Sequence, residues 1–350
     1  MTPTTEPELP HLSPDLKGKT IHMSKIVRFH ATGGPEVLTL DDIEVREPGH
    51  GEIRIRTRAL GVNRADAMLR NNRLVKLPSG IGWEASGEVD AIGPDVEGFT
   101  VGDAISLIPC FRPTDYPIHG ELAIAPATAV ARHPDSLSWE QTAALWGQYL
   151  TAYGALIETA DLKAGDTVLI SAASSSVGLA AIQVARSVGA RPVALTRSSA
   201  KRRRLLDEGA EAVVVTGEED VVTRVNELTD GHGARVIFDP VGGPALAGLI
   251  GAAAPGGTVI VYGVLNSEAT TVPVMGLINK SLTIRGYKLW ELTTDVERRK
   301  VAVDWILDGL AGKTLRPVID TVFPLEDIVG AHRRLESGSQ VGKIVVTVPH

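Results

Sequence analysis

The feature of this sequence that most limits its fold is an alternation of short apolar runs and helix-like segments between residues 167 and 287. Six runs have the length and composition of buried strands, at Thr167–Ala172, Pro192–Thr196, Ala212–Val215, Val236–Asp239, Thr258–Tyr262 and Leu282–Tyr287. Helices are expected between them, at Val177–Gly189, Ala200–Glu208, Asp220–Thr229 and Pro244–Ala254. Strands joined by helical crossovers pair in parallel and form a doubly wound sheet. The alternation therefore predicts an α/β domain that binds a nucleotide where the strand order reverses.

The segments on either side follow a different pattern. Between residues 25 and 131, short strands are separated by turns that contain Gly, Pro or Asp, at Ile26–Ala31, Val37–Leu40, Glu52–Leu60, Gly87–Ile92, Ala104–Pro109 and Glu121–Pro126. These strands predict a strand-rich, barrel-like domain. A helical spacing over Glu140–Ile157 leads into the alternation. After the alternation, helices and strands are expected at Asp295–Leu310, Val318–Phe323, Leu325–Glu336 and Lys343–Val348.

Three parts of the chain follow from these patterns. Residues 1–22 contain four prolines and no periodicity, which predicts a mobile tail. Residues 23–147 form the barrel-like domain, and residues 148–287 form the nucleotide-binding domain. Because residues 288–350 do not continue the alternation, we expect them to complete the barrel-like domain, which is then discontinuous.

Composition excludes several classes of partner. The 350 residues carry a net charge of −7 without a long basic block, which argues against nucleic acid or an anionic membrane surface as a partner. No apolar run approaches the ~20 residues of a membrane span. The single cysteine, Cys110, excludes an internal disulfide and a four-Cys zinc site, and it fits a reducing cytoplasm.

A candidate phosphate-binding loop follows the first strand of the alternation. Residues 173–178, Ala-Ser-Ser-Ser-Val-Gly, occupy the register of a Gly-x-Gly-x-x-Gly loop but keep only its last glycine. The small Ala173 permits a tight turn, Gly178 lets the helix pack on the strand, and the free N–H groups at the helix start favour an anion. The expected cofactor contacts here are Ser174, Ser175, Ser176 and Val177. The alternative is an ordinary serine-rich turn.

The next strand indicates which dinucleotide is bound. An NAD site usually has a carboxylate about 20 residues after the loop, but residues 167–206 contain no Asp or Glu. Instead, cationic and hydroxyl side chains that suit a 2′-phosphate follow the second strand, namely Thr196, Arg197, Ser198 and Lys201. This arrangement favours NADPH over NADH, although part of the basic run 201–204 also fits a solvated helix face.

Several further stretches match a known family: Ala59–Asp66, Pro78–Val89, Val101–Asp103, Leu150–Tyr153 and Gly342–Val345, together with the loop 173–178. On these stretches the chain, from Met23 to its end, resembles the medium-chain dehydrogenase/reductase superfamily, in its zinc-free quinone oxidoreductase branch. The resemblance implies a Rossmann-type sheet, a GroES-like catalytic domain, and NADPH-dependent reduction of a quinone or another conjugated carbonyl.

The resemblance also bears on metal binding. Zinc-dependent members of the superfamily hold the catalytic metal through a Cys and a His at the positions of Asn63 and Trp83 in this chain. Neither residue is a usable zinc ligand, so we expect no metal and no Lewis acid. A quinone or an α,β-unsaturated carbonyl accepts hydride without that help, provided that a donor stabilises the developing oxyanion. Asn63 is the candidate donor, and a turn-stabilising Asn is its alternative interpretation.

Other site residues are implied by position in the family. A Tyr that often follows this Asn by five residues is Met68 here, so Tyr149 is the candidate phenol, with core packing as its alternative. The candidate substrate pocket comprises Met68, Trp83, Phe111, Trp146, Tyr149 and Trp290. The remaining candidate cofactor contacts are Asn63, Thr151, Pro240, Tyr262, Gly263, Val264 and Lys343.

Three alternatives to quinone reduction remain at this point. They are reduction of a 2-enone or alkenal double bond, a low-turnover NADPH-binding protein, and a metal-dependent alcohol dehydrogenase with other ligands. Members of the branch commonly pair through the last strand of the nucleotide-binding sheet, which predicts a homodimer through Ser281–Tyr287.

Overall fold

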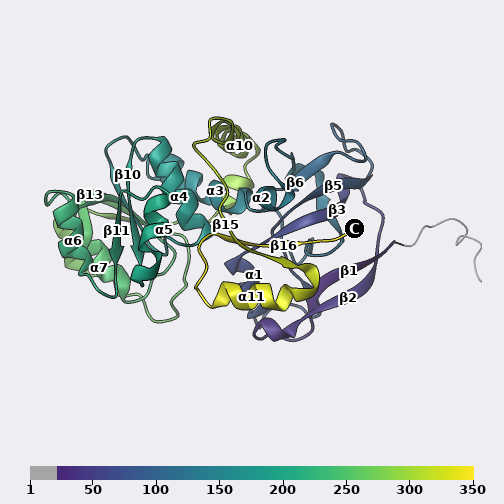
Figure 1. Cartoon of the computed structure of the whole chain (residues 1–350), viewed down its shortest axis with the longest axis horizontal. Helices are drawn as coiled ribbons and strands as arrows, with labels where there is room; N and C mark the ends of the chain where they lie inside the picture. The colour runs from purple at the N-terminus through teal and green to yellow at the C-terminus, as the bar shows by residue number, and fades with distance from the viewer. Residues whose placement is uncertain (1–21) are drawn as a thin grey trace, which may run out of the picture.

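The computed structural model describes residues 22–350, which form two lobes side by side along the long axis of the molecule (Figure 1). The predicted tail lies outside the described residues except for His22, which is the first residue of a strand.

One lobe is built on a six-stranded parallel sheet, as predicted. Its strands are β9 (Thr167–Ile170), β10 (Arg191–Thr196), β11 (Ala212–Val215), β12 (Ala234–Asp239), β13 (Ala253–Val261) and β14 (Thr283–Gly286). The order β11-β10-β9-β12-β13-β14 reverses between β9 and β12. This reversal is the topological switch point at which such sheets bind ligands, beyond the carboxyl ends of the strands.

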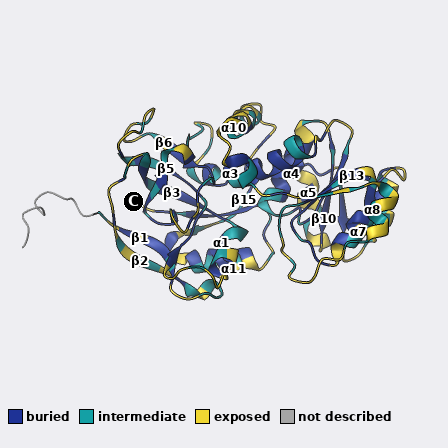
Figure 2. Cartoon of the chain, turned by 180° about the vertical axis from the view of Figure 1, so that it is seen from behind, coloured by how far each residue is buried: buried dark blue, intermediate teal, exposed yellow. Residues whose placement is uncertain are grey.

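Five helices connect these strands: α4 (Ser176–Ser187), α5 (Arg202–Asp207), α6 (Val221–Leu228), α7 (Ala245–Ala252) and α8 (Val274–Lys280). The first four correspond to predicted helices, whereas α8 was not predicted. Figure 2 shows that the inner strands of this sheet are largely buried and that α8 exposes much of its surface, whereas the outer strand β14 is mostly exposed.

The second lobe is a barrel-like assembly in which the strands pair antiparallel, except for the parallel pair β15–β16. A three-stranded sheet contains β1 (His22–Phe29), β2 (Leu38–Val45) and β4 (Ser79–Gly80). The larger sheet runs in the order β15 (Ile319–Pro324), β16 (Lys343–Thr347), β3 (Glu52–Val62), β5 (Glu84–Ile92), β6 (Ala104–Leu107) and β8 (Val130–Arg132), and β7 (Leu122–Pro126) also pairs with β3. Two helices, α1 (Arg64–Arg70) and α11 (Ile328–Glu336), belong to this lobe.

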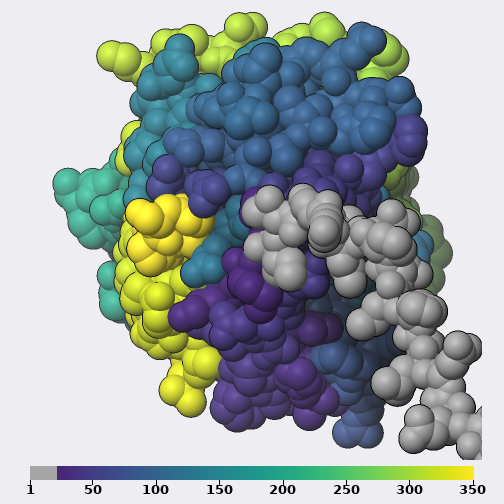
Figure 3. Space-filling model, turned by 90° about the vertical axis from the view of Figure 1, so that its right-hand side faces the viewer, coloured from purple at the N-terminus to yellow at the C-terminus, as the bar shows by residue number. Residues whose placement is uncertain are grey.

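The two ends of the described chain meet in this lobe. β16 pairs antiparallel with β3, so that Ile344 lies opposite Val62. Figure 3 shows the C-terminal segment, in yellow, next to the N-terminal strands in purple. The last strand therefore completes a sheet that the first half of the chain begins.

The predicted helix over Glu140–Ile157 is divided in the structure. It consists of α2 (Trp139–Ala143), α3 (Trp146–Tyr153) and a π-helical turn over Gly154–Thr159. The chain returns from the parallel sheet through α9 (Trp290–Thr293) and α10 (Val296–Ala311). Four short 3₁₀ turns complete the fold, at Pro35–Val37, Ala127–Ala129, Ser199–Lys201 and Leu325–Asp327.

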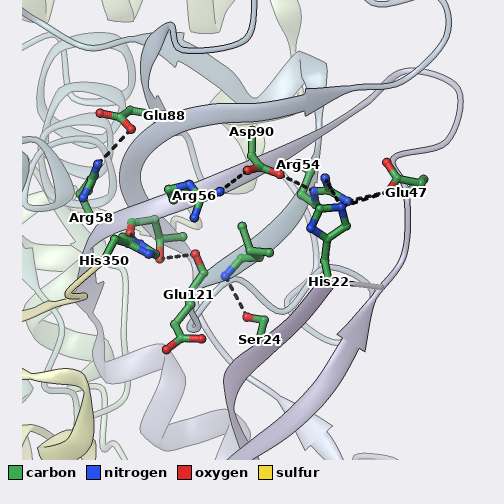
Figure 4. Close-up of polar contacts among 12 residues, drawn as sticks. His22, Ser24, Glu47, Arg54, Arg56, Arg58, Glu88, Asp90, Glu121 and His350 are labelled. Atoms are coloured by element: carbon green, nitrogen blue, oxygen red, sulfur yellow. Dashed lines mark hydrogen bonds and ion pairs between the residues drawn. The ribbon is translucent and has the colours of Figure 1, made fainter. Parts of the chain in front are cut away.

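A row of ion pairs stabilises the outer part of the barrel-like lobe (Figure 4). Arg54 and Arg56 point to the same side of β3 because side chains two residues apart share a face. Both contact Asp90 of β5, with nitrogen–oxygen distances of 2.6 Å. Arg58, two residues further on, contacts Glu88 at 3.1 Å. This charge pattern helps to fix the register of the two strands.

Candidate active site

The loop after β9 has the geometry of an anion site. Ser175 caps α4, because its Oγ accepts a hydrogen bond from the Gly178 N–H at 3.0 Å. A Cβ on Gly178 would lie only 2.6 Å from the Ala173 carbonyl oxygen, so a glycine is needed for this close packing. At the start of a helix, N–H groups such as those of Ser176 and Val177 have no partner within the helix. Together with the helix dipole, they favour a phosphate at this loop.

Lys201 connects this loop to the other lobe. Its Nζ donates to Ser174 Oγ, Gly338 O and Gln340 O, each at 2.9 Å. The Gly342 N–H also donates to the Ser174 carbonyl at 3.0 Å. Since all three ammonium donors of Lys201 have protein acceptors, its main role in the structure is to tie the phosphate loop to residues 338–340.

Arg197 differs from the rest of the basic run. The carboxylates of Glu219, Asp207 and Glu208 pair with Arg202, Arg203 and Arg204, respectively. Over residues 22–350, no carboxylate lies within the 4.0 Å ion-pair distance of Arg197, which is exposed at the end of β10. Its neighbours Thr196 and Ser198 are joined by a hydrogen bond of 3.3 Å between the Thr196 hydroxyl and the Ser198 carbonyl. Arg197 is thus the cation with donors available for a 2′-phosphate.

The loops after β12 and β13 border the same edge of the sheet. The buried Asp239 accepts hydrogen bonds from the N–H groups of residues 241 and 242 at 3.2 and 2.8 Å. Gly263 packs against Pro240, where a Cβ would lie 2.9 Å from the Pro240 carbonyl oxygen. Burial raises the pKa of the Tyr262 hydroxyl well above its usual range, so this side chain remains a neutral phenol. Val264, by contrast, is 59% exposed.

Asn63 lies in the barrel-like lobe, between the end of β3 and the start of α1. Its Nδ2 donates to the Gly61 carbonyl at 3.1 Å, and its Oδ1 accepts from Lys343 Nζ at 2.7 Å. Lys343 is also ion-paired with Glu84, and both side chains are only 1% exposed. The second carboxylate oxygen of Glu84 accepts from the Gly147 N–H at 2.7 Å.

The structure therefore changes the interpretation of Lys343. Its position in the family made it a candidate cofactor contact, but its ammonium is buried against Glu84 and Asn63. Glu84 was not among the candidate site residues. A charged residue inside the apolar run 81–87 was the available signal, because an acid buried in a strand requires a partner.

Further titratable side chains are buried behind Asn63. The Asp66 carboxylate accepts from the Asn63 and Gly82 N–H groups at 2.8 and 3.1 Å, and burial raises its pKa to about 7. Burial lowers the pKa of His119 and of His332 to about 3, so both imidazoles are neutral at physiological pH.

Two of the predicted pocket aromatics meet. Trp83 and Trp290 are far apart in the sequence but pack edge to face, with ring centroids 6.0 Å apart. Met68 lies on α1 and is 52% exposed. Phe111 and Trp146, however, are core residues, 5% and 1% exposed. We therefore retain only Met68, Trp83 and Trp290 as candidates for contact with a substrate.

The candidate phenol is also part of the core. The Tyr149 hydroxyl donates to Gln183 Oε1 at 2.7 Å and accepts from the Arg316 N–H at 3.2 Å. Burial raises its pKa above the usual range. The packing alternative therefore fits Tyr149 better than a role in proton transfer. On the same helix, the Thr151 hydroxyl donates to the Gly147 carbonyl at 2.6 Å.

An anion-binding loop at the switch point of a parallel sheet, next to a barrel-like lobe, defines the class of two-domain dehydrogenases. The alcohol dehydrogenase GroES-like domain matches residues 49–171, and the zinc-binding dehydrogenase domain matches residues 176–308. This chain belongs to the quinone oxidoreductase family of the medium-chain dehydrogenase/reductase superfamily.

Three relatives illustrate the match. A quinone oxidoreductase of Pseudomonas aeruginosa is 32% identical over 327 residues, covering 93% of this chain and 99% of the relative. The structure of the Escherichia coli quinone oxidoreductase complexed with NADPH is 29% identical with a TM-score of 0.85, covering 92% of this chain and 99% of that one. A 2-haloacrylate reductase structure is 27% identical with a TM-score of 0.80, over 92% and 99% of the two chains.

Two features are not found in the described part of the chain. Residues 22–350 contain no cluster of three or more His, Cys, Asp or Glu side chains that could hold a metal ion. None of the helices over these residues combines the length and the apolar character that crossing a membrane requires.

Proposed function

We propose that this protein is an NADPH-dependent quinone oxidoreductase. The observation that carries the proposal is the juxtaposition of two sites: a loop suited to an anion with the available cation Arg197, and the Asn63 amide. Gly342 bonds to Ser174 of this loop, and its neighbour Lys343 bonds to Asn63. The sequence relatives named quinone oxidoreductase, and the NADPH complex of one of them, support the same activity.

The residues present fit this cofactor. The start of α4 and Ser174 suit the pyrophosphate, and Arg197 suits the 2′-phosphate. The loops at Pro240 and Gly263 border the same edge of the sheet. Once bound, NADPH supplies a hydride, and a quinone that takes up this hydride and one proton becomes a hydroquinone.

The protein side chains position and stabilise the acceptor. Trp83, Trp290 and Met68 offer apolar surface for a flat ring. The Asn63 amide nitrogen carries two hydrogens and gives one to Gly61, so the other can donate to the oxygen on which negative charge develops. Because the Tyr149 hydroxyl is occupied within the core, we propose that the proton comes from solvent.

A second activity, reduction of an activated alkene, uses the same site. The similarity to a 2-haloacrylate reductase and the presence of Met68 in place of a tyrosine support this second activity. The experiment is to follow NADPH oxidation with a simple quinone and with a 2-enone, and to identify the products. Much higher efficiency with the enone, giving a saturated ketone, would overturn quinone reduction. Tight NADPH binding without turnover of either acceptor would instead indicate a binding protein.

We further propose a cytoplasmic homodimer. β14 is the outer strand of the parallel sheet, and no strand within residues 22–350 pairs with its other edge. Next to this sheet α8 exposes three apolar side chains, those of Val274, Met275 and Ile278, which are 62–63% exposed. Pairing of two β14 edges across a two-fold axis would cover both the edge and this surface.

A further inference from the structure

The strand pairing brings Lys343 to Asn63 from 280 residues away in the sequence. Since Ile344 pairs with Val62, the preceding residue of β16 lies next to the residue that follows β3. The contact therefore depends on the completed sheet. It is absent from either strand alone.

The Lys343–Glu84 ion pair is costly in free energy because both charges are buried. Both side chains are 1% exposed, and burying two charges often costs as much as their attraction returns. Replacing such a pair by apolar side chains is often neutral or stabilising, so stability alone does not account for it.

The surroundings of Glu84 are shaped to hold it. Its carboxylate lies at the N-terminus of α3, where the helix dipole favours negative charge, and accepts the Gly147 N–H. A Cβ on Gly147 would lie 2.9 Å from both carboxylate oxygens, so the glycine makes room for the carboxylate.

The consequence for Asn63 concerns the orientation of its amide. An amide can turn by 180° and exchange its oxygen and nitrogen. The Lys343 ammonium can only donate hydrogen bonds. It therefore pairs with the oxygen of the Asn63 amide and cannot pair with the amide nitrogen. The nitrogen is then held towards Gly61, with its second hydrogen free to donate.

We propose that Lys343, held in place by Glu84, is a positioning residue that orients the Asn63 amide to donate to the carbonyl oxygen of the acceptor. The ammonium also polarises the amide, which strengthens the second N–H as a donor. This inference rests on the proposed function, because it assigns the amide to the acceptor oxygen.

The test is a mutant cycle that leaves no unpaired buried charge. The double variant Lys343→Met/Glu84→Gln removes the donor to Asn63, while the amide oxygen introduced at position 84 can still accept the Gly147 N–H. We expect kcat for a quinone to fall by about 10- to 100-fold, with KM for NADPH changed less than about threefold. Asn63→Ala should cause a similar loss in kcat. The triple variant, which combines Asn63→Ala with Lys343→Met and Glu84→Gln, should lose no more kcat than Asn63→Ala alone.

Two further variants separate orientation from general stability. Lys343→Arg keeps a charged donor and should recover part of kcat. Arg54→Met/Asp90→Asn neutralises another buried pair in the same lobe, shown in Figure 4, and should alter the melting temperature without changing kcat. Additive losses in the triple variant, or an unchanged kcat in the Lys343→Met/Glu84→Gln variant, would overturn the inference.

Failure of the proposed function can be distinguished from failure of this inference about Lys343. If the wild-type protein reduces neither a quinone nor an enone, the proposed function is wrong. The orientation of Asn63 can then still be measured by NMR of its side-chain amide. We expect the amide protons of Asn63 to exchange with solvent at least about tenfold faster in the double variant than in wild type. Equal exchange rates would show that Lys343 does not hold this amide.

Discussion

Arg197 provides the most direct test of cofactor recognition. Among residues 22–350, it is the one basic residue of positions 197 and 201–204 without a side-chain partner, because Lys201 is bonded to three oxygens and the other three arginines have acidic partners. Replacing Arg197 by Ala should therefore remove the principal contact to a 2′-phosphate while leaving the protein scaffold intact.

The size of the effect follows from the exposure of the side chain. A hydrogen bond to a charged group contributes about 1.5–3 kcal/mol, and solvent screening at an exposed arginine reduces this to about 1–2 kcal/mol. Because 1.4 kcal/mol corresponds to a tenfold change, the Kd for NADPH should rise by about 5- to 30-fold. The Kd for NADH, which has no 2′-phosphate, should change by less than about twofold.

The assay is titration of each nucleotide by calorimetry at a fixed, physiological ionic strength. Arg203→Ala is the matched control, because Arg203 belongs to the same basic run but is paired with Asp207. It should leave both affinities unchanged. Equal weakening of NADPH and NADH by Arg197→Ala, or an equal effect of Arg203→Ala, would refute the assignment of the 2′-phosphate to Arg197.

Three other predictions concern stability and assembly. Lys201→Met removes one hydrogen bond to the phosphate loop and two to residues 338 and 340 of the other lobe, and should lower the free energy of unfolding by about 1–3 kcal/mol in urea titrations of the protein without cofactor; an unchanged midpoint of unfolding would contradict this role of Lys201. Ile278→Glu places a charge on the apolar surface of α8 and should give a folded monomer by light scattering, whereas a dimeric mass in this variant would refute that interface. His119 is neutral in the folded protein because its pKa is lowered to about 3, so its contribution to stability is complete above pH 6.5 and is lost as the pH falls towards 3. In His119→Phe, the loss of stability between pH 6.5 and 4.5 should be smaller than in wild type, and an equal loss in both proteins would count against this reasoning.

The sequence was most informative where local pattern determines structure. The parallel sheet and its first four helices follow from periodicity, because each strand and helix carries its own apolar repeat. The division of the helix near Trp146 could not be predicted in this way. The new helix start is capped by Glu84, which accepts the Gly147 N–H although it lies 63 residues away in the sequence.

In the candidate site, too, some residues could be predicted from local sequence spacing and others could not. The loop at Ser175 and the cation Arg197 could be predicted, because spacing along one strand–loop–helix unit places them. The partners of Lys343 and Tyr149 could not, since each is set by packing between segments far apart in the sequence. Family position indicated where these residues lie along the fold but not the direction of their side chains.

The tie between the phosphate loop and residues 338–342 has a consequence for protein engineering. Residues 338–342 precede β16 of the barrel-like lobe, yet they contact Ser174 and Lys201 of the parallel-sheet lobe. A chimera that exchanges only residues 148–287 with a relative would separate these partners. Transplanting cofactor preference between members of the family therefore requires moving two stretches of chain, the sheet and the short segment before the last strand.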